Sequence, residues 1–269
     1  MPTTPHRIPH RMARFLRALF CGGELLAVLT LRMWRSRGRG GGFSLLWPIL
    51  TPLLLLAVYY CAFGVILDLR QANGGLHYAL SIFSGMAVFN IFAESLQAGA
   101  CSLIARPGYV KNSTVALEVL PLAAVGCAFL SGLCWFTVVL AAAGWAGTLG
   151  VRLLWLPLIL LPYCAFCAGT ALFAGAVSVF LRDFPQFAVV FQQGIFFLTP
   201  IVFPIGIIPA SVRPLIHANP LTGFVEAFRA AVFGLPVTGV ETLWLSGALV
   251  GLLGWGVFHR MKGAIIDAV

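Results

Sequence analysis

The residues that most often carry enzyme chemistry are few in this sequence, and they do not form a recognisable site. Its two lysines are Lys111 and Lys262, and neither stands in the GxxxxGK[ST] loop that binds nucleotide phosphates in many ATPases. The five histidines are scattered, with no HExxH pair and no carboxylate at metal-ligand spacing. We therefore expect no catalytic residue, metal site or cofactor in this chain. If it moves a solute uphill, the energy must come from an ion gradient or from a separate motor subunit.

The seven cysteines are an odd number and lie mostly in apolar segments, where cysteine behaves as a small hydrophobic residue. Cys164 and Cys167 form a CxxC pair. A single pair inside an apolar helix is a weak signal, so we expect neither metal nor redox chemistry from it.

Acidic side chains are the remaining candidates, because a carrier driven by protons or sodium ions needs ligands at membrane depth. Glu94 lies inside an apolar segment, where a relay and a structural hydrogen bond are both open as its role. Glu118 and Asp183 stand at the edges of apolar segments, where they are better placed to meet another protein than an ion. This scarcity argues against an ion-coupled carrier.

The amino-acid composition shows whether the segments that hold these residues face water or lipid. Hydrophobic residues make up 60% of the 269 residues and charged residues only 9%, against about 25% charged in an ordinary soluble domain. With a mean hydropathy of +0.98, the chain lacks the polar side chains needed to cover a water-exposed surface. This excludes a cytosolic enzyme, a disordered tail and a secreted disulfide scaffold. Long unbroken apolar runs, without the alternation of membrane strands, predict an all-α integral membrane protein.

Six apolar segments are expected to form transmembrane helices of about 20 residues or more. With the N-terminus inside, 13 of the 17 basic residues fall in cytoplasmic segments, which predicts that both termini are cytoplasmic. Eight of the 17 lie between Arg7 and Arg39, where they orient the chain, and we expect no nucleic acid partner. The six segments are residues 43–67, 77–103, 118–146, 152–181, 187–204 and 240–258.

The region ahead of the first segment has a helical pattern of its own. Residues 13–36 place Leu26, Leu29 and other apolar side chains near helical spacing beside arginines, which predicts an amphipathic interface helix on the cytoplasmic membrane surface. A plain positively charged retention signal is the alternative. Glycines then break the helix, so we divide the chain into a cytoplasmic N-terminus at residues 1–42 and a six-span domain at residues 43–269.

The region between the fifth and sixth segments, residues 205–239, is too apolar for an ordinary loop and too short for two crossings, and its re-entrant part is expected at about 205–234. Asn219 and Pro220 supply an N-cap and a first-turn proline for a helix that Gly234 can close. We expect a re-entrant helical hairpin at an outer gate, and the alternative is a helix lying flat on the outer leaflet. The two gate candidates, Glu226 and Arg229, are three residues apart and can pair on one helix face.

Aromatic residues are enriched in the first, second and fifth segments. Most aromatic side chains of membrane proteins pack in the protein or face lipid, but their rings can also stack on the apolar C–H faces of sugars. The candidates for a substrate channel are Tyr59, Tyr60, Phe63, Phe89, Phe92, Phe196 and Phe197.

Several stretches together resemble the permease subunits of ATP-binding-cassette polysaccharide exporters, the type-2 permease family that exports O-antigen, capsule and teichoic acid chains. They cover most of the chain, and their order and spacing are fairly specific to this class. They are ELLAVLTLRMWR at residues 24–35 leading into FSLLWPILTPLLLL, FNIFAESL around Glu94, LEVLPL around Glu118, LRDFPQF at 181–187, TPIVFP at 199–204 and NPLTGFVEAFR at 219–229.

The resemblance implies a homodimer of six-span permeases bound to two nucleotide-binding ATPase subunits, which hold the ATP and magnesium. It also implies a cytoplasmic coupling segment at residues 104–117 and a channel lined by the first and fifth spans of both protomers. Charges at the cytoplasmic boundaries can pair across an interface. Our candidates for coupling to the ATPase are Arg32, Arg35, Glu118, Arg182 and Asp183.

We therefore expect the transmembrane permease subunit of an exporter for a lipid-linked, O-antigen-like polysaccharide, surrounded by the lipids of a bacterial inner membrane and without ATPase activity of its own. A capsule or teichoic acid exporter, or a drug or lipid exporter of the same fold, is the alternative within the family. Outside it, the rival classes are an ion-coupled carrier and a membrane-embedded enzyme.

Overall fold

The structure, a computed structural model, describes residues 23–36, 47–62, 74–111, 116–149, 151–202 and 209–268. Within these ranges every regular element is a helix, in agreement with the expected all-α class. After a helix at residues 23–36 come α2 (Trp47–Tyr59), α3 (Gly74–Ser102), α4 (Pro107–Lys111), α5 (Val119–Trp145), the 3-10 helix η2 (Val151–Trp155), α6 (Leu156–Phe180), α7 (Phe184–Phe197), α8 (Arg213–Ala218), α9 (Pro220–Val232) and α10 (Val240–Ala268).

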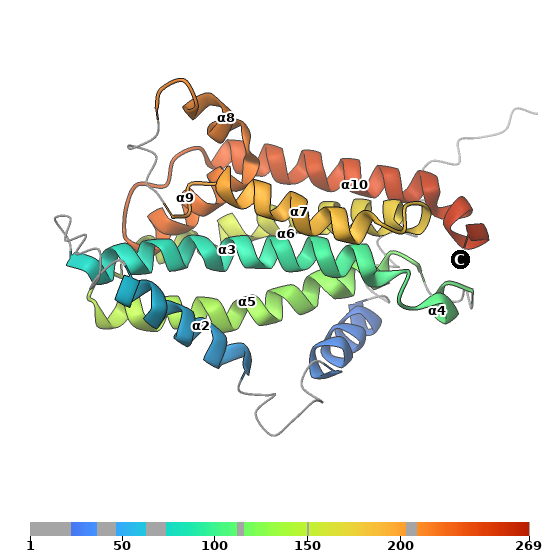
Figure 1. Cartoon of the computed structure of the whole chain (residues 1–269), viewed down its shortest axis with the longest axis horizontal. Coiled ribbons are helices and arrows are strands. Elements are labelled where there is room, and N and C mark those ends of the chain that lie inside the picture. The colour runs from blue at the N-terminus through green and yellow to red at the C-terminus, as the bar shows by residue number, and fades with distance from the viewer. Residues whose placement is uncertain are drawn as a thin grey trace, which may run out of the picture.

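The long helices α3, α5, α6 and α10 run along the length of the molecule. α3, α6 and α10 run in one direction, and α2, α5 and α7 run in the opposite direction (Figure 1). α3 lies at the centre, where it contacts α2, α5, α6, α7 and α9, whereas α10 packs mainly on α6. The helix at residues 23–36, α4 and the C-terminal end of α10 lie toward one end of the bundle, and α8 and α9 lie toward the other (Figure 1). These ends are called the α4 end and the α9 end below.

Four helical stretches among the described residues are long and apolar enough to cross a membrane: His77–Ser102, Val119–Trp145, Arg152–Phe180 and Val240–Ala268. The other two predicted spans correspond to α2 and α7, which have 13 and 14 residues. A helix of that length extends about 20 Å, less than the roughly 30 Å of a bilayer's hydrocarbon core. The predicted span at 43–67 reaches into residues outside the described ranges.

Two predicted helix boundaries were wrong, for different reasons. The predicted fifth segment, 187–204, is replaced by α7, which ends at Phe197 because Pro200 follows and proline cannot continue a helix. The predicted sixth segment stops at residue 258, but α10 continues to Ala268. Its last turns are held by protein contacts, since Ile265 is fully buried in an apolar cluster with residues of α5 and α6 and with Leu103, which follows α3.

Aromatic rings from several helices meet in the core between α3, α5, α6 and α9. Phe136 of α5 stacks on Phe228 of α9 with ring centres 4.6 Å apart, and Tyr163 of α6 lies 5.0 Å from Phe224 of α9. Both phenylalanines of α9 and Tyr163 are almost fully removed from the surface. In a membrane protein such rings stabilise the bundle mainly through close van der Waals packing. These rings fix α9 inside the α9 end of the bundle.

The close packing of α6 on α10 depends on glycines at their crossing. A Cβ atom added at Gly254 would overlap Gly169 of α6, and one added at Gly247 would overlap the backbone of Pro162. A Cβ atom at Gly251, between them, would lie 3.2 Å from the Ala165 carbonyl oxygen. In lipid, where apolar side chains gain little by leaving the solvent, such close backbone approach is a main source of helix association.

We expect the substitution Gly254→Ala to destabilise the chain by about 1–3 kcal/mol, because α6 and α10 must move apart to admit the methyl group. The matched control is Gly256→Ala on the same helix, where nothing lies within 4 Å of an added Cβ atom. Thermal unfolding of the two purified variants in detergent measures the difference. Equal unfolding midpoints would show that this glycine contact does not stabilise the helix pair.

Candidate functional site

The helix α9 has the capping residues that the sequence predicts. Asn219 is its N-cap, and the side-chain oxygen of Asn219 accepts a hydrogen bond from the backbone N–H of Leu221 at 3.1 Å. Pro220 occupies the first turn, and Gly234 follows the last turn with a positive φ of 68°. The N-cap, the first-turn proline and the closing glycine are thus confirmed.

Arg229 of α9 makes the densest set of polar contacts at this end of the molecule. Only 9% of its surface is exposed, and it is the one charged residue in the described ranges that is buried. Its guanidinium group donates from Nε to the Ser81 carbonyl of α3 at 2.9 Å. Nη1 donates to the Pro200 carbonyl and Nη2 to the Ile201 carbonyl, both at 2.7 Å. One side chain therefore ties α9 to α3 and to the segment that follows α7.

Two further hydrogen bonds fix the segment after α7. The Asn219 Nδ2 group donates to Thr199 Oγ1 at 2.9 Å, and the Tyr78 hydroxyl donates to the Val202 carbonyl at 2.8 Å. Residues 199–202 are non-helical, and non-helical backbone at membrane depth is tolerated only when it is buried in protein or lines a watery cavity. Together with Arg229, these side chains supply the partners that such a segment needs.

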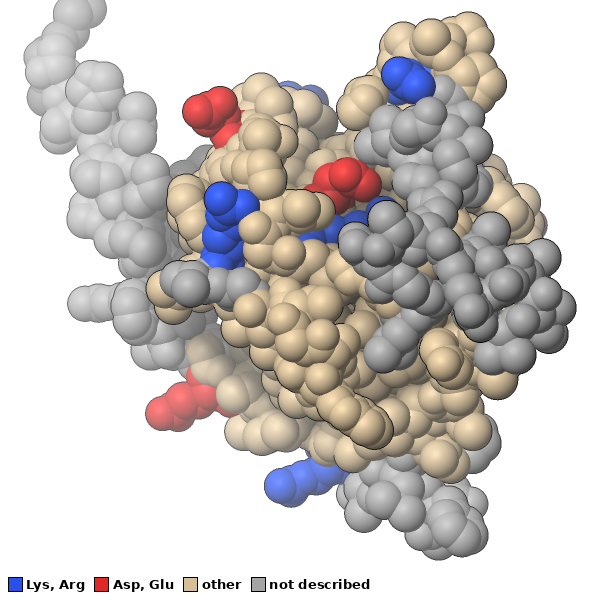
Figure 2. All heavy atoms as spheres, turned by 90° about the vertical axis from the view of Figure 1, so that its left-hand side faces the viewer, with Lys and Arg blue, Asp and Glu red and all other residues tan. Residues whose placement is uncertain are grey.

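Glu226 and Arg229 form the predicted pair, with Arg229 Nη1 donating to Glu226 Oε1 at 3.3 Å. The two side chains differ in environment, because 45% of the Glu226 side chain is exposed but only 11% of the Arg229 side chain. Elsewhere at the α9 end, the few charged side chains stand apart on a mostly uncharged surface (Figure 2). The pair therefore connects a buried charge to the surface of this end.

At the α4 end, the predicted coupling residue Glu118 is engaged within the chain. Its Oε1 atom accepts a hydrogen bond from Lys262 Nζ at 2.7 Å. This ion pair joins the start of α5 to the end of α10, beside the apolar cluster that contains Ile265. Glu118 holds α10 against the bundle, and its role toward a partner stays a prediction.

The other coupling candidates lie on the surface. Arg182 and Asp183 are exposed in the turn between α6 and α7, and Asp183 occupies the N-cap position of α7 without a side-chain capping bond. Arg35 is exposed near the end of the helix at residues 23–36. Of the predicted interface helix at 13–36, residues 13–22 lie outside the described ranges.

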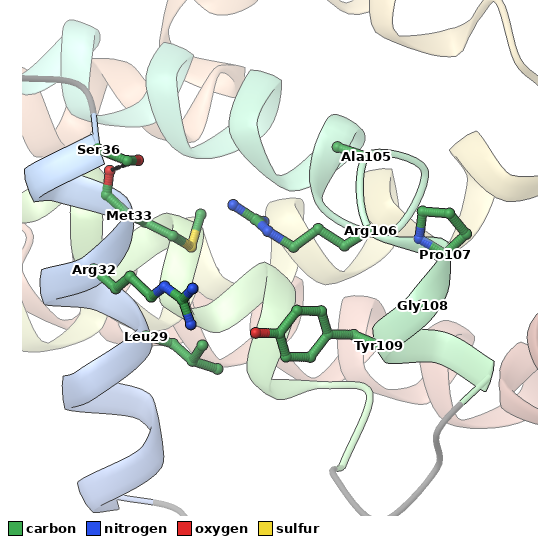
Figure 3. Close-up of a pocket in the computed structure, with 9 residues that line it drawn as sticks. All are labelled: Leu29, Arg32, Met33, Ser36, Ala105, Arg106, Pro107, Gly108 and Tyr109. Carbon is green, nitrogen blue, oxygen red and sulfur yellow. Dashed lines mark hydrogen bonds between the residues drawn. The ribbon is translucent and has the colours of Figure 1, made fainter. Parts of the chain in front are cut away.

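Arg32 lines a pocket of about 460 Å³ between the helix at residues 23–36 and the segment around α4. Arg32 and Arg106 point toward each other across this pocket, and the Tyr109 hydroxyl points into the same space (Figure 3). Leu29 and Met33 form its apolar side, and Leu29 also packs on Val119 and Ala123 at the start of α5. Arg106 and Tyr109 lie in the predicted coupling segment, but neither was among the predicted coupling residues.

The aromatic residues predicted to line a channel fall into two groups, those buried in the core and those exposed on the surface. Phe89 and Phe92 lie in the core, and Phe196 packs on Phe89 with ring centres 5.2 Å apart. Tyr59 is half-buried against the same core, whereas Tyr60 and Phe197 are exposed. Phe63 lies outside the described ranges. A ring packed on all sides offers no face to a solute, so the exposed rings are the stronger lining candidates.

α7 carries two exposed rings that belong to the aromatic-rich fifth segment but were not among the selected channel candidates. Phe187 and Phe191, one turn apart, stack with ring centres 6.1 Å apart, and both are exposed. Ala188 is the one buried residue of this helix. The many phenylalanines of the fifth predicted segment indicated an aromatic helix. Helical periodicity alone could not show which of these rings are exposed. With Phe197, they give α7 an exposed aromatic surface.

The arrangement suits transport. One ion pair stands at each end of an apolar bundle, Glu226 with Arg229 at the α9 end and Glu118 with Lys262 at the α4 end. Within the described ranges no three His, Cys, Asp or Glu residues lie close enough to hold a metal ion. Four long apolar helices join the two ends, so this is a multi-pass membrane protein whose polar residues can meet partners on either side.

Comparison with known proteins agrees with this reading. The chain is similar to two proteins of Klebsiella pneumoniae called O-antigen export system permease protein RfbA, with 26% identity over 246 residues and 25% over 243. Each alignment covers 89% of this chain and 92% of the relative. A protein of Myxococcus xanthus with the same name is 26% identical over 266 residues, covering 96% of this chain and all of the relative. Residues 24–233 match the model of the ABC-2 type transporter family. The chain is therefore a membrane subunit that belongs to the ABC-2 type transporter family.

Proposed function

We propose that this chain is the permease subunit of an exporter that moves a lipid-linked, O-antigen-like polysaccharide across the bacterial inner membrane, powered by a separate ATPase. The observation that carries this proposal is the similarity to O-antigen export permeases over nine-tenths or more of their length. The family match across residues 24–233 supports the same conclusion. This match includes residues on both sides of the domain boundary that we predicted between residues 42 and 43. That domain division stays a prediction.

The proposed topology has six spans and both termini in the cytoplasm, with the α4 end inside. It is supported by the alternating directions of the helices, which place the basic residues of the helix at residues 23–36, of the α3–α4 connection and of the end of α10 toward one end (Figure 1). Positive residues beside spans are retained on the cytoplasmic side. In this arrangement α2 and α7 are the first and fifth spans.

The proposed outer gate consists of α8 and α9 as a re-entrant pair. It is supported by the burial of ten of the 13 residues of α9 and by the hydrogen bonds that Arg229 makes to residues 200 and 201. A flat interfacial helix would expose one apolar face to lipid, whereas α9 is packed against α3, α6, η2 and α10. We keep Glu226 and Arg229 as the residues of this gate.

The proposed complex contains two permeases and two ATPase subunits, with ATP and magnesium on the ATPases. The pocket between the helix at residues 23–36 and α4 supports an ATPase contact at the α4 end, because an interface helix and a coupling segment meet there. The exposed aromatic surface of α7 leaves rings available to a second permease or to a substrate path on that side, with lipid as the alternative neighbour of a membrane-spanning helix.

The test of the function is deletion of the permease gene in its own bacterium, followed by measurement of polysaccharide on both sides of the inner membrane. We expect long-chain surface polysaccharide to disappear while its lipid-linked precursor accumulates inside the cell. Complementation with the wild-type chain should restore export, and a catalytically inactive ATPase subunit should reproduce the deletion. Normal surface polysaccharide in the deletion strain would remove polysaccharide as the substrate.

A further inference from the structure

The pocket at the α4 end brings together two guanidinium groups from different elements. Arg32 comes from the helix at residues 23–36, and Arg106 comes from the connection between α3 and α4. Both side chains, with the hydroxyl of Tyr109, point into one space of about 460 Å³ (Figure 3). This convergence differs from an ordinary solvated basic surface, where long side chains spread apart into water.

Neither arginine is paired with a carboxylate in the described part of the chain. The two ion pairs found there are Glu226 with Arg229 and Glu118 with Lys262, one at each end of the bundle. Glu24 lies eight positions before Arg32, about 12 Å along the same helix, and does not line the pocket. Two cations that share a partly enclosed space repel each other, and an anion placed between them removes that repulsion.

The pocket has the shape and chemistry for a carboxylate on a side chain. Arginine presents a planar fork of N–H donors that matches the two oxygens of a carboxylate, and two such forks with a phenol can engage both oxygens. Leu29 and Met33 line the same pocket and can receive the aliphatic stem of a glutamate. The occupant that fits is therefore an acidic side chain with apolar neighbours.

We propose that this pocket is an acid-binding socket, in which Arg32, Arg106 and Tyr109 hold one carboxylate side chain of the ATPase subunit. The inference rests on the proposed function, because it presumes the ATPase partner, and it adds the chemistry of the contact. An ATPase residue is favoured over a lipid headgroup because α4 follows the end of the apolar span at Ser102 and its Tyr109 is exposed, which places one wall of the socket beyond the apolar part of the bundle.

The experiment compares binding of the purified ATPase subunit to inverted membrane vesicles that contain wild-type or variant permease. Arg106→Glu should weaken binding by about tenfold or more, because the variant sets a carboxylate against a carboxylate. Arg106→Lys should weaken it less, since it keeps the charge but loses the planar fork. The control is Arg260→Glu, an exposed charge reversal on α10 outside the socket, which should bind normally. Gel filtration of each solubilised variant establishes that it is folded.

A charge swap then identifies the partner residue. Each surface aspartate and glutamate of the ATPase is changed to arginine, and one of these variants should restore binding to Arg106→Glu membranes while binding wild-type membranes poorly. Undiminished binding by a folded Arg106→Glu variant overturns the socket. The socket is also overturned if Arg106→Glu membranes lose ATPase binding and no ATPase variant restores it. In that case, ATPase binding that depends on phosphatidylglycerol in the vesicles assigns the pocket to a lipid headgroup. If wild-type permease does not bind the ATPase at all, the proposed function fails instead.

Discussion

Replacing Arg229 with alanine should prevent most of the chain from reaching a stable folded state. The substitution leaves the buried carbonyls of Pro200 and Ile201 without the donors that they have in the structure, and it opens a space beside Ser81. Leaving a buried carbonyl without its donor costs about 1–3 kcal/mol, and loss of several such hydrogen bonds is a large part of a typical protein's stability. The measurement is the yield of monodisperse protein and its thermal unfolding midpoint in detergent.

Two companion variants separate the contribution of the guanidinium group from that of charge. Arg229→Lys keeps the charge but cannot reach three carbonyls in fixed directions, so we expect an intermediate loss. Arg152→Ala removes an exposed arginine that bonds a single carbonyl at the same end, Gly234, and should unfold close to the wild type. If Arg229→Ala unfolds like Arg152→Ala, the buried guanidinium group does not hold residues 199–202 in place.

Replacing Phe187, Phe191 and Phe197 together with alanine should abolish most polysaccharide export while leaving the chain folded. These rings are exposed on α7, so their loss creates no cavity within this chain. Aromatic pairs in proteins contribute about 0.5–1.5 kcal/mol each, and three lost contacts of that size correspond to a reduction of about tenfold or more. Surface polysaccharide, normalised to the amount of permease in the membrane, measures the effect.

Two single substitutions serve as controls for this triple variant. Phe180→Ala removes an exposed ring of α6 and should leave export unchanged, whereas Phe89→Ala empties a core position and should cost about 3–5 kcal/mol of stability. The oligomeric state of the triple variant must also be measured. Loss of export together with dissociation into monomers would assign the rings to the dimer interface, and unchanged export in the triple variant would contradict both roles.

Where proline, glycine or a capping side chain sets the boundary of a helix, the sequence identified where that helix begins and ends. Asn219, Pro220 and Gly234 define α9 through backbone geometry that each residue type imposes by itself. The end of α10 was not visible in this way. Charged residues after Phe258 resemble the end of a membrane segment, but apolar contacts from α5, from α6 and from Leu103 keep the chain helical to Ala268.

The sequence by itself determined the solvent, the helical class and the family, because these depend on composition and on motifs that each lie within a short stretch of chain. It could not determine which face of each helix is buried. In a membrane, lipid tails are as apolar as the protein core, so helix periodicity does not separate Phe89, which is buried, from Phe197, which is 70% exposed. Only the tertiary structure decided this.

The polar contacts that define both ends of the molecule were likewise decided by the tertiary structure. Arg229 bonds Ser81, 148 positions away, and Lys262 bonds Glu118, 144 positions away. A charged side chain in an apolar helix predicts that a partner lies nearby, because burying an unpaired charge carries a large desolvation penalty. The partner, however, is set by which helices pack together, and for Arg229 it is mainly backbone carbonyls, which every residue carries and no sequence pattern marks.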